Sequence, residues 1–298
     1  MRKFSLDQSL IQELVVIIKE SIDSGEDIDS FIRGVADFLI DSQGLREQVG
    51  QVIIENERAP GSKVKGTMGK DGHNLFFYRK GLEHAYENYA EGIPDLFDED
   101  EKKVIKYLSY AKVIIHELEH LKQAVDVKDE NKTDLKSLVL KLCDRENGIS
   151  AQIGYKVMRK LHPTERFADI VAYDSIISIC DALGDKYDRV SALFELFNLT
   201  GYIDGYLTSF EEGYDSKNGP TYFCMKEFTK KEQFEEFERL LMSSDLSFDE
   251  RVFLGVNLSQ EEIDSIAKHH TELVTTLKST GSRPASQTTV ETTSKTIK

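Results

Sequence analysis

Two histidines with three residues between them stand near the middle of the chain, in the run His-Glu-Leu-Glu-His from His116 to His120. On a helix, positions four apart lie one above the other on one face, so both imidazoles can reach the same metal ion. Zinc accepts neutral imidazole nitrogens readily, and two such ligands leave room for a third protein ligand and a water molecule. Glu117 follows the first histidine and would lie beside that water, where it can act as a general base. The spacing predicts a metal-dependent hydrolytic site that still needs a third ligand.

Three residues compete for that third position: Asp126, His162 and Glu165. Asp126 lies six residues after His120, as in the metzincin pattern. That pattern requires a glycine where this chain has Gln123, because the helix must turn sharply to bring the ligand back. His162 has a ring that can bind a metal, but it precedes a proline and nothing in the sequence fixes its direction.

Glu165 is the candidate that the sequence favours, because it opens the segment Glu-Arg-Phe-Ala-Asp that ends at Asp169. On a helix these two carboxylates face the same way, so Glu165 can ligate zinc while Asp169 accepts a hydrogen bond from a ligating histidine. Two acidic groups on a strongly apolar helix would be costly to bury without a metal or a base as partner. The alternative is a first-turn glutamate stabilised by the helix dipole, beside a solvated aspartate.

Together, the segments 116–120 and 165–169 resemble the signature of the gluzincin zinc metallopeptidases, which carry H-E-x-x-H on one helix and E-x-x-x-D on a second. The resemblance implies His116, His120 and Glu165 as zinc ligands, Glu117 as general base and Asp169 as the residue that orients a ligand. It also implies a sheet edge beside the first helix that binds extended peptide. The chain is more loosely similar to the ImmA/IrrE metalloproteases of phage and mobile elements, although the E-A-N run of that group is missing after Glu165.

The elements that must position these residues are predicted to be mostly helical. Apolar periodicity and four acidic residues at the start predict one helix over 98–125, and a second, capped by Thr164, over 165–183. Similar patterns predict further helices at 5–23, 29–41, 82–90, 150–161, 189–210, 230–243, 247–255 and 259–278, and one that ends at 143. Residues 52–54 read as a short strand, and 64–68 and 74–79 flank an Asp-Gly turn typical of an antiparallel hairpin.

These elements indicate an α+β fold that is predominantly helical. We expect a zincin-like domain, with a small antiparallel hairpin or sheet beside the active-site helix, and helical regions at both ends. The predicted regions are an N-terminal helical region over 1–58, the metallopeptidase domain with its helical C-terminal part over 59–278, and a Ser/Thr-rich tail over 279–298. The tail has almost nothing to bury and is expected to be disordered.

The charge of the chain favours some classes of binding partner and disfavours others. The net charge of −15 over 298 residues disfavours binding to nucleic acid or to an anionic membrane. The segment 58–80 reverses the sign, with six basic residues against one acidic. Lys63, Lys65, Lys70 and Arg79 in this segment favour an acidic peptide or protein substrate, and the alternative is that they are edge-strand charges that discourage aggregation.

The cellular compartment is inferred from three features of the sequence. The first eighteen residues are interrupted by charge and lead to no small-residue cleavage site, so no signal peptide is predicted. No run of eighteen apolar residues is present to span a bilayer. Three widely spaced cysteines without a C-x-x-C pair read as reduced thiols, and the prediction is a cytoplasmic protein.

The sequence therefore predicts a zinc-dependent peptidase that uses a metal-activated water and Glu117 as general base. The alternative is a catalytically silent, zinc-stabilised regulatory or binding protein of phage or mobile-element type. Glu117 distinguishes them, because a purely structural zinc site closes its fourth position and needs no base. The group that would stabilise the oxyanion is left open among His84, Tyr155, His162 and Tyr173.

Overall fold

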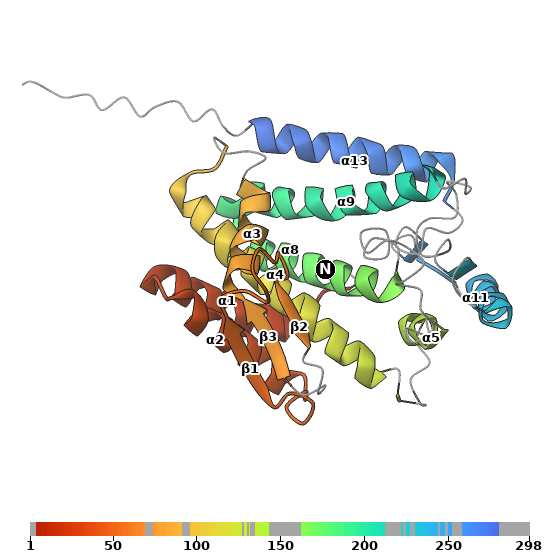
Figure 1. Ribbon diagram of the computed structural model, residues 1–298. Coiled ribbons are helices and arrows are strands. Elements are labelled where there is room, and N and C mark those ends of the chain that lie inside the picture. The colour runs from red at the N-terminus through yellow and green to blue at the C-terminus, as the bar shows by residue number, and fades with distance from the viewer. Residues whose placement is uncertain are drawn as a thin grey trace, which may run out of the picture.

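The computed structural model describes residues 4–68, 74–90, 96–126, 128–129, 131, 135–142, 162–211, 222, 225–226, 230–243, 245–247, 250–251 and 258–279. Within these ranges the chain is predominantly helical with one small three-stranded sheet (Figure 1). The predicted α+β class with mostly helical content is confirmed. None of the described helices is long and apolar enough to cross a membrane.

Two helices and then three strands form the N-terminal part, and every described element from residue 79 onward is helical. In chain order the elements are α1 (Gln8–Ser24), α2 (Ile28–Ser42), β1 (Gln51–Glu55), β2 (Gly66–Met68), β3 (Asn74–Tyr78), α3 (Arg79–Ala90), α4 (Glu99–Asp126), α5 (Leu135–Leu142), α8 (Pro163–Leu183), the short 3-10 helix η2 (Asp185–Tyr187), α9 (Asp188–Glu211), α11 (Lys231–Ser243) and α13 (Gln260–Ser279).

The sheet has the strand order β1-β3-β2. β2 runs antiparallel to β3, with Gly66 opposite Phe77, which confirms the predicted pairing of these two strands. The Asp-Gly turn predicted to join them lies outside the described residues. β1 adds to the other side of β3 in parallel, with Gln51 opposite Asn74. The parallel partner was not predicted, because periodicity within a strand does not reveal which strand lies beside it.

α4 forms the centre of the fold (Figure 1). Asp98 and Glu101 cap its start reciprocally: the Asp98 side chain accepts from the Glu101 backbone N–H at 2.8 Å, and the Glu101 side chain accepts from the Asp98 N–H at 2.9 Å. Most of its side chains between Val104 and Leu121 are buried, because α8 packs on one side while α2, α3 and β2 contact others. A helix that is covered on several sides can hold its side chains in fixed positions.

The N-terminal helices α1 and α2 share one apolar core with α4 and α8. The Leu6 N–H donates to Ser175 Oγ at 2.9 Å, and the Tyr107 hydroxyl donates to the Glu26 carbonyl at 2.7 Å. α9 packs on the far side of α8, and α13 covers α9 (Figure 1). The pair of helices α4 and α8 is therefore held from both sides.

The structure differs from the predicted helices at the starts of α1, α3 and α8 and in the cap of α8; α3 begins at Arg79 rather than residue 82. α1 begins at Gln8 rather than residue 5, with Asp7 preceding it. α8 begins at Pro163 rather than 165, and its cap is His162, not Thr164, because His162 Nδ1 accepts from the Thr164 backbone N–H. The predicted helix over 150–161, most of that over 247–255 and the tail beyond 279 lie outside the described residues.

Candidate metal centre

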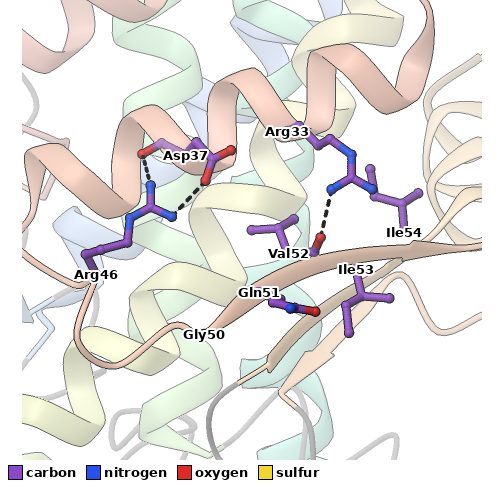
Figure 2. Close-up of a pocket in the computed structure, with 8 residues that line it drawn as sticks. All are labelled: Arg33, Asp37, Arg46, Gly50, Gln51, Val52, Ile53 and Ile54. Carbon is purple, nitrogen blue, oxygen red and sulfur yellow. Dashed lines mark hydrogen bonds and ion pairs between the residues drawn. The ribbon is translucent and has the colours of Figure 1, made fainter.

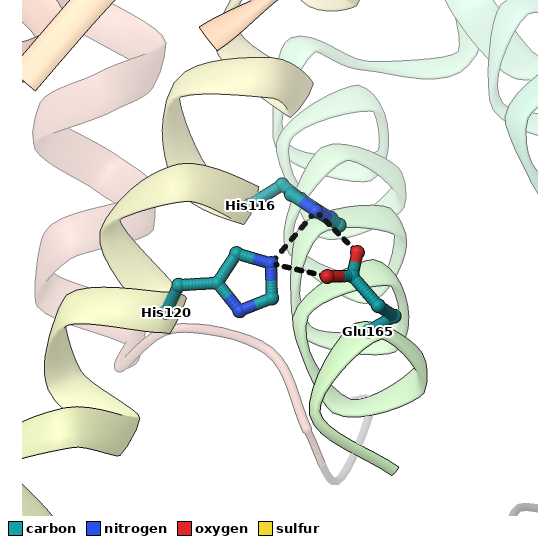
Figure 3. A group of neighbouring side chains, drawn as sticks. All are labelled: His116, His120 and Glu165. Atoms are coloured by element: carbon teal, nitrogen blue, oxygen red, sulfur yellow. Dashed lines mark hydrogen bonds and ion pairs between the residues drawn. The ribbon is translucent and has the colours of Figure 1, made fainter. Parts of the chain in front are cut away.

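Three of the predicted site residues converge between α4 and α8 (Figure 3). His116 Nε2 and His120 Nε2 lie 3.1 Å apart, and the Glu165 carboxylate oxygens lie 3.5 Å from His116 Nε2 and 3.4 Å from His120 Nε2. Adjacent turns of α4 supply the histidines, and the first turn of α8 supplies the glutamate. The residues could hold one metal ion, since their ligand atoms all lie within 4.8 Å of one another.

Asp169 lies beside His116, whereas the sequence predicted a contact with a ligating histidine without specifying which of the two. Its Oδ1 is 2.9 Å from His116 Nδ1, close enough for a strong charge interaction, although the direction departs from that of a good hydrogen bond. The same oxygen accepts from Lys112 Nζ at 2.5 Å. Lys112, one turn before His116 on α4, also lies 4.5 Å from the centre of the Tyr173 ring. The sequence reading missed Lys112, and its spacing of four residues before His116 was the one available signal.

Gln123 lies behind His120. Its Oε1 is 3.2 Å from His120 Nδ1, and its Nε2 donates to the Thr164 carbonyl of α8 at 3.1 Å. The residue is 4% exposed; its contact with Thr164 is buried and its contact with His120 is partly buried. The sequence predicted only that Gln123 would let the helix continue, which it does, because α4 extends to Asp126.

The charges of the cluster depend strongly on one another. Burial raises the pKa of Glu165, but its contacts with His116 and His120 outweigh burial and hold the pKa well below its usual range. Asp169 is half-buried; desolvation raises its pKa, but the charges of Lys112 and His116 outweigh it and hold the pKa well below its usual value. Burial lowers the pKa of His116, whereas Asp169 and Glu165 raise it, and the net shift is upward. The carboxylates are therefore ionised and act only as acceptors.

The other two candidates for the third ligand, Asp126 and His162, do not belong to the group of His116, His120 and Glu165. Asp126 is the last residue of α4, and it is not part of the cluster of His116, His120 and Glu165. His162 is buried at the start of α8, where its Nδ1 lies 2.7 Å from Thr164 Oγ1 and accepts from the Thr164 N–H at 3.3 Å. His162 therefore caps a helix.

Glu117 lies against another neighbour of α4, the strand β2. A Cβ atom placed on Gly66 would lie 2.8 Å from Glu117 Cγ and 3.3 Å from Glu117 Oε1. The close approach of strand and helix at this point is possible because Gly66 has no side chain. Gly66 is therefore a second residue that the sequence reading missed, and an isolated glycine inside a predicted strand was its signal.

The basic segment and the oxyanion candidates have partners of their own. Arg79 binds Asp29 through two contacts of 2.7 and 2.5 Å, so its charge is neutralised by α2. The Tyr173 hydroxyl lies 3.1 Å from the Tyr89 hydroxyl, and His84 Nδ1 lies 3.5 Å from Glu87. Lys70 and Tyr155 lie outside the described residues.

A pocket lies at the other edge of the sheet, between α2 and β1 (Figure 2). Arg33 Nη1 donates to the Val52 carbonyl at 3.0 Å, while Arg46 pairs with Asp37 and Asp41 at 2.9 and 2.6 Å. Since β1 and β2 are opposite edges of the sheet, this pocket is separate from the β2 edge that Glu117 faces.

Comparison with known proteins gives no family. No family model, no curated protein and no solved structure matches this chain. The geometry of the cluster, together with the sequence pattern that predicted it, therefore remains the basis for assigning a function.

Proposed function

We propose that the protein is a zinc-dependent peptidase of gluzincin type with a zincin-like fold. The observation that carries the proposal is the convergence of His116 Nε2, His120 Nε2 and the Glu165 carboxylate between two buried helices. Asp169 lies on the Nδ1 side of the His116 ring, and Gln123 lies on the Nδ1 side of the His120 ring. The two Nε2 lone pairs are therefore directed at each other and at the Glu165 carboxylate. Such a set of acceptors repels itself unless a cation or a proton lies between them.

The donor set fits zinc better than a hard cation. Two imidazole nitrogens and one carboxylate are a ligand combination found in catalytic zinc sites, whereas calcium and magnesium prefer oxygen ligands throughout. His116, His120 and Glu165 would hold the ion, and Asp169 and Gln123 would orient the rings. Bound there, zinc would supply Lewis-acid chemistry that acidifies a water molecule and polarises the scissile carbonyl.

Glu117 performs the proton transfer in the proposed reaction. It takes the proton of the attacking water as the new C–O bond forms, and it gives that proton to the leaving amine as the C–N bond breaks. Its side chain is half-buried against Gly66, which limits the positions it can adopt. The substrate would be a peptide in extended form, added to the sheet at β2, the edge strand that this carboxylate faces.

Several details of the substrate follow from the chain's charges. The overall charge of −15 argues against nucleic acid and anionic membranes as partners, and we infer a peptide or protein substrate in the cytoplasm. Lys63 and Lys65 precede β2, so an acidic peptide is favoured at this edge. Arg79 does not support this preference, since Asp29 neutralises it.

The metal content of the purified protein tests the proposal. We expect one zinc per chain in the wild type, and loss of the metal or a large fall in affinity in Glu165→Ala, because removal of one of three ligands opens the site. Asp126→Asn is the matched control, since this acidic residue lies outside the cluster and should leave zinc unchanged. Unchanged zinc affinity in Glu165→Ala would contradict the proposed ligand set.

Hydrolysis of a mixed peptide library separates the peptidase from the silent zinc protein. Cleavage that disappears on chelation and returns with zinc supports the enzyme. Full zinc occupancy without any cleavage would favour the regulatory alternative over the enzyme.

A further inference from the structure

The orientation of the Gln123 amide is determined by its two neighbours. The Thr164 carbonyl can only accept a hydrogen bond, so the Gln123 group 3.1 Å from it must be the NH2 group. The other end of the amide, the carbonyl oxygen Oε1, must then face His120 Nδ1 at 3.2 Å. An amide oxygen can only accept, so the hydrogen in this contact has to come from His120.

We propose that Gln123 is a positioning residue that selects the Nδ1–H tautomer of His120 and leaves Nε2 unprotonated for the metal. A neutral imidazole carries one hydrogen, and the partner of one nitrogen decides which nitrogen keeps it. The backbone of α8 is thus the reference point: Thr164 fixes the amide, and the amide fixes the ring. The contribution of Gln123 to metal binding rests on the proposed function, whereas its selection of the His120 tautomer does not.

The two histidines are therefore held by different kinds of acceptor. His116 faces the carboxylate of Asp169, which carries a charge and is shared with Lys112. His120 faces a neutral amide, which raises the basicity of the ring less than a carboxylate would. Gln123 also ties His120 to the residue immediately before Glu165, so that one side chain links two of the three proposed ligands.

The test compares wild type with Gln123→Met, a substitution of similar size that removes both hydrogen bonds. In the metal-free protein, at a pH where the rings are neutral, nitrogen NMR of wild-type His120 should report a hydrogen on Nδ1. Gln123→Met should report a mixture of tautomers, and its zinc affinity should fall by about 10–100-fold, the usual effect of losing such a partner. Gln48→Met is the control, a partly buried glutamine outside the cluster.

A second variant guards against the possibility that Gln123→Met fails to fold. In Gln123→Glu, a carboxylate still accepts from His120 Nδ1 but can no longer donate to Thr164, so the Nδ1–H tautomer should persist. Loss of that tautomer in Gln123→Glu would overturn the proposal. So would a Gln123→Met protein with the wild-type tautomer and a zinc affinity within about twofold, because Gln123 would then only join two helices.

The NMR result keeps this proposal separable from the proposed function. A wild-type protein that binds no zinc, yet shows the hydrogen on Nδ1, would end the metallopeptidase proposal and support the selection of the tautomer. A wild-type protein that binds zinc but carries the hydrogen on Nε2 in its metal-free form would overturn the role of Gln123 alone.

Discussion

α4 meets α8 on one side and β2 on another, and the two contacts are formed by different kinds of residue. Toward α8, the side chains of His116 and Lys112 are 5% and 9% exposed and lie against the carboxylates of Asp169 and Glu165. His120 lies against the Gln123 amide. Toward β2, the half-buried Glu117 meets the backbone of a glycine. We call the first region the α4–α8 seam and the second the β2 contact.

The difference assigns separate tasks to the two regions. In the seam, Lys112 Nζ lies 2.5 Å from Asp169, and the two carboxylates lie within 3.5 Å of the histidine nitrogens, an arrangement suited to holding an ion in fixed geometry. At the β2 contact, the carboxylate lies against a position without a side chain, which suits a group that must accept and release a proton beside a substrate. Variants of the seam should therefore change metal affinity and stability, and variants of the β2 contact should change turnover.

The largest expected effect comes from Glu117→Gln. The amide cannot take a proton, so hydrolysis should fall by about 10²–10⁴-fold. Zinc content and melting temperature should stay at wild-type values, because Glu117 is outside the ligand set. Glu99→Gln on the exposed first turn of α4 is the control, with unchanged activity. Loss of zinc in Glu117→Gln would break the division between the two regions, and retained activity would remove the proposed mechanism.

Lys112→Met should have the largest effect on stability in the seam. It leaves Asp169 with one cationic neighbour fewer, and breaking a buried ion pair on one side costs about 3–5 kcal/mol, here at the lower end because His116 remains. The site also becomes more negative, so added zinc should raise the melting temperature by more than in wild type. Thermal unfolding with and without zinc measures both effects.

The control for this variant is Lys102→Met, which removes a half-buried lysine paired with the exposed Glu99 and should change the unfolding free energy by at most about 1 kcal/mol. Equal stability of Lys112→Met and Lys102→Met would show that Lys112 does not belong to the seam. A smaller zinc-induced shift than in wild type would contradict its electrostatic role.

The sequence predicted the parts of the fold that depend on local patterns. α4 and α8 follow from apolar periodicity and capping residues, and the cluster follows from the spacing within 116–120 and 165–169. That Glu165 rather than Asp126 joins the two histidines was also within reach, because a glutamine at position 123 continues a helix where a glycine would end it.

The remaining features depend on contacts between distant segments. Lys112 meets Asp169 across 57 positions, and Gln123 meets Thr164 across 41, so no local pattern signals either pair. The sequence predicts Thr164, a residue type that often caps helices, as the cap of α8, and the structure gives that role to His162. The approach of Gly66 to Glu117 similarly needs the register of β2 against α4, which strand periodicity does not specify.

Two glycines near β2 offer a pair of substitutions with opposite expected results. In Gly66→Ala the new Cβ would displace the flexible Glu117 side chain, so hydrolysis should fall by about 10–100-fold while stability changes little. In Gly81→Ala the Cβ would lie 2.0 Å from the Val64 carbonyl oxygen, so backbone must move and unfolding free energy should fall by about 1–3 kcal/mol.

Kinetics with zinc-loaded protein and denaturant unfolding of both variants check this pair. Full zinc content in Gly66→Ala would support the view that the α4–α8 seam holds the metal and that the β2 contact affects turnover alone. Unaltered hydrolysis in Gly66→Ala would mean that the β2 contact does not position Glu117.

The smallest expected effect is the pH dependence of the metal-free protein. The pKa of His116 is raised above its ordinary value of about 6.5, because Asp169 and Glu165 together outweigh burial. The stabilisation from this protonated ring is complete below the ordinary pKa and is lost as pH rises through the raised one. The melting temperature of the metal-free protein should therefore decline over that interval, by about 2–4 °C for each kcal/mol lost.

Zinc affinity should change in the opposite direction over the same interval, because protons compete with the metal for the ring nitrogens. Asp169→Asn removes one of the two carboxylates that raise the pKa, so the decline in melting temperature should shrink or move to lower pH. Glu117→Gln should leave it unchanged, since this side chain faces the β2 contact. If Glu117→Gln altered the decline as much as Asp169→Asn, the two sides of α4 would titrate as one unit, and the separation of metal holding from proton transfer would not hold.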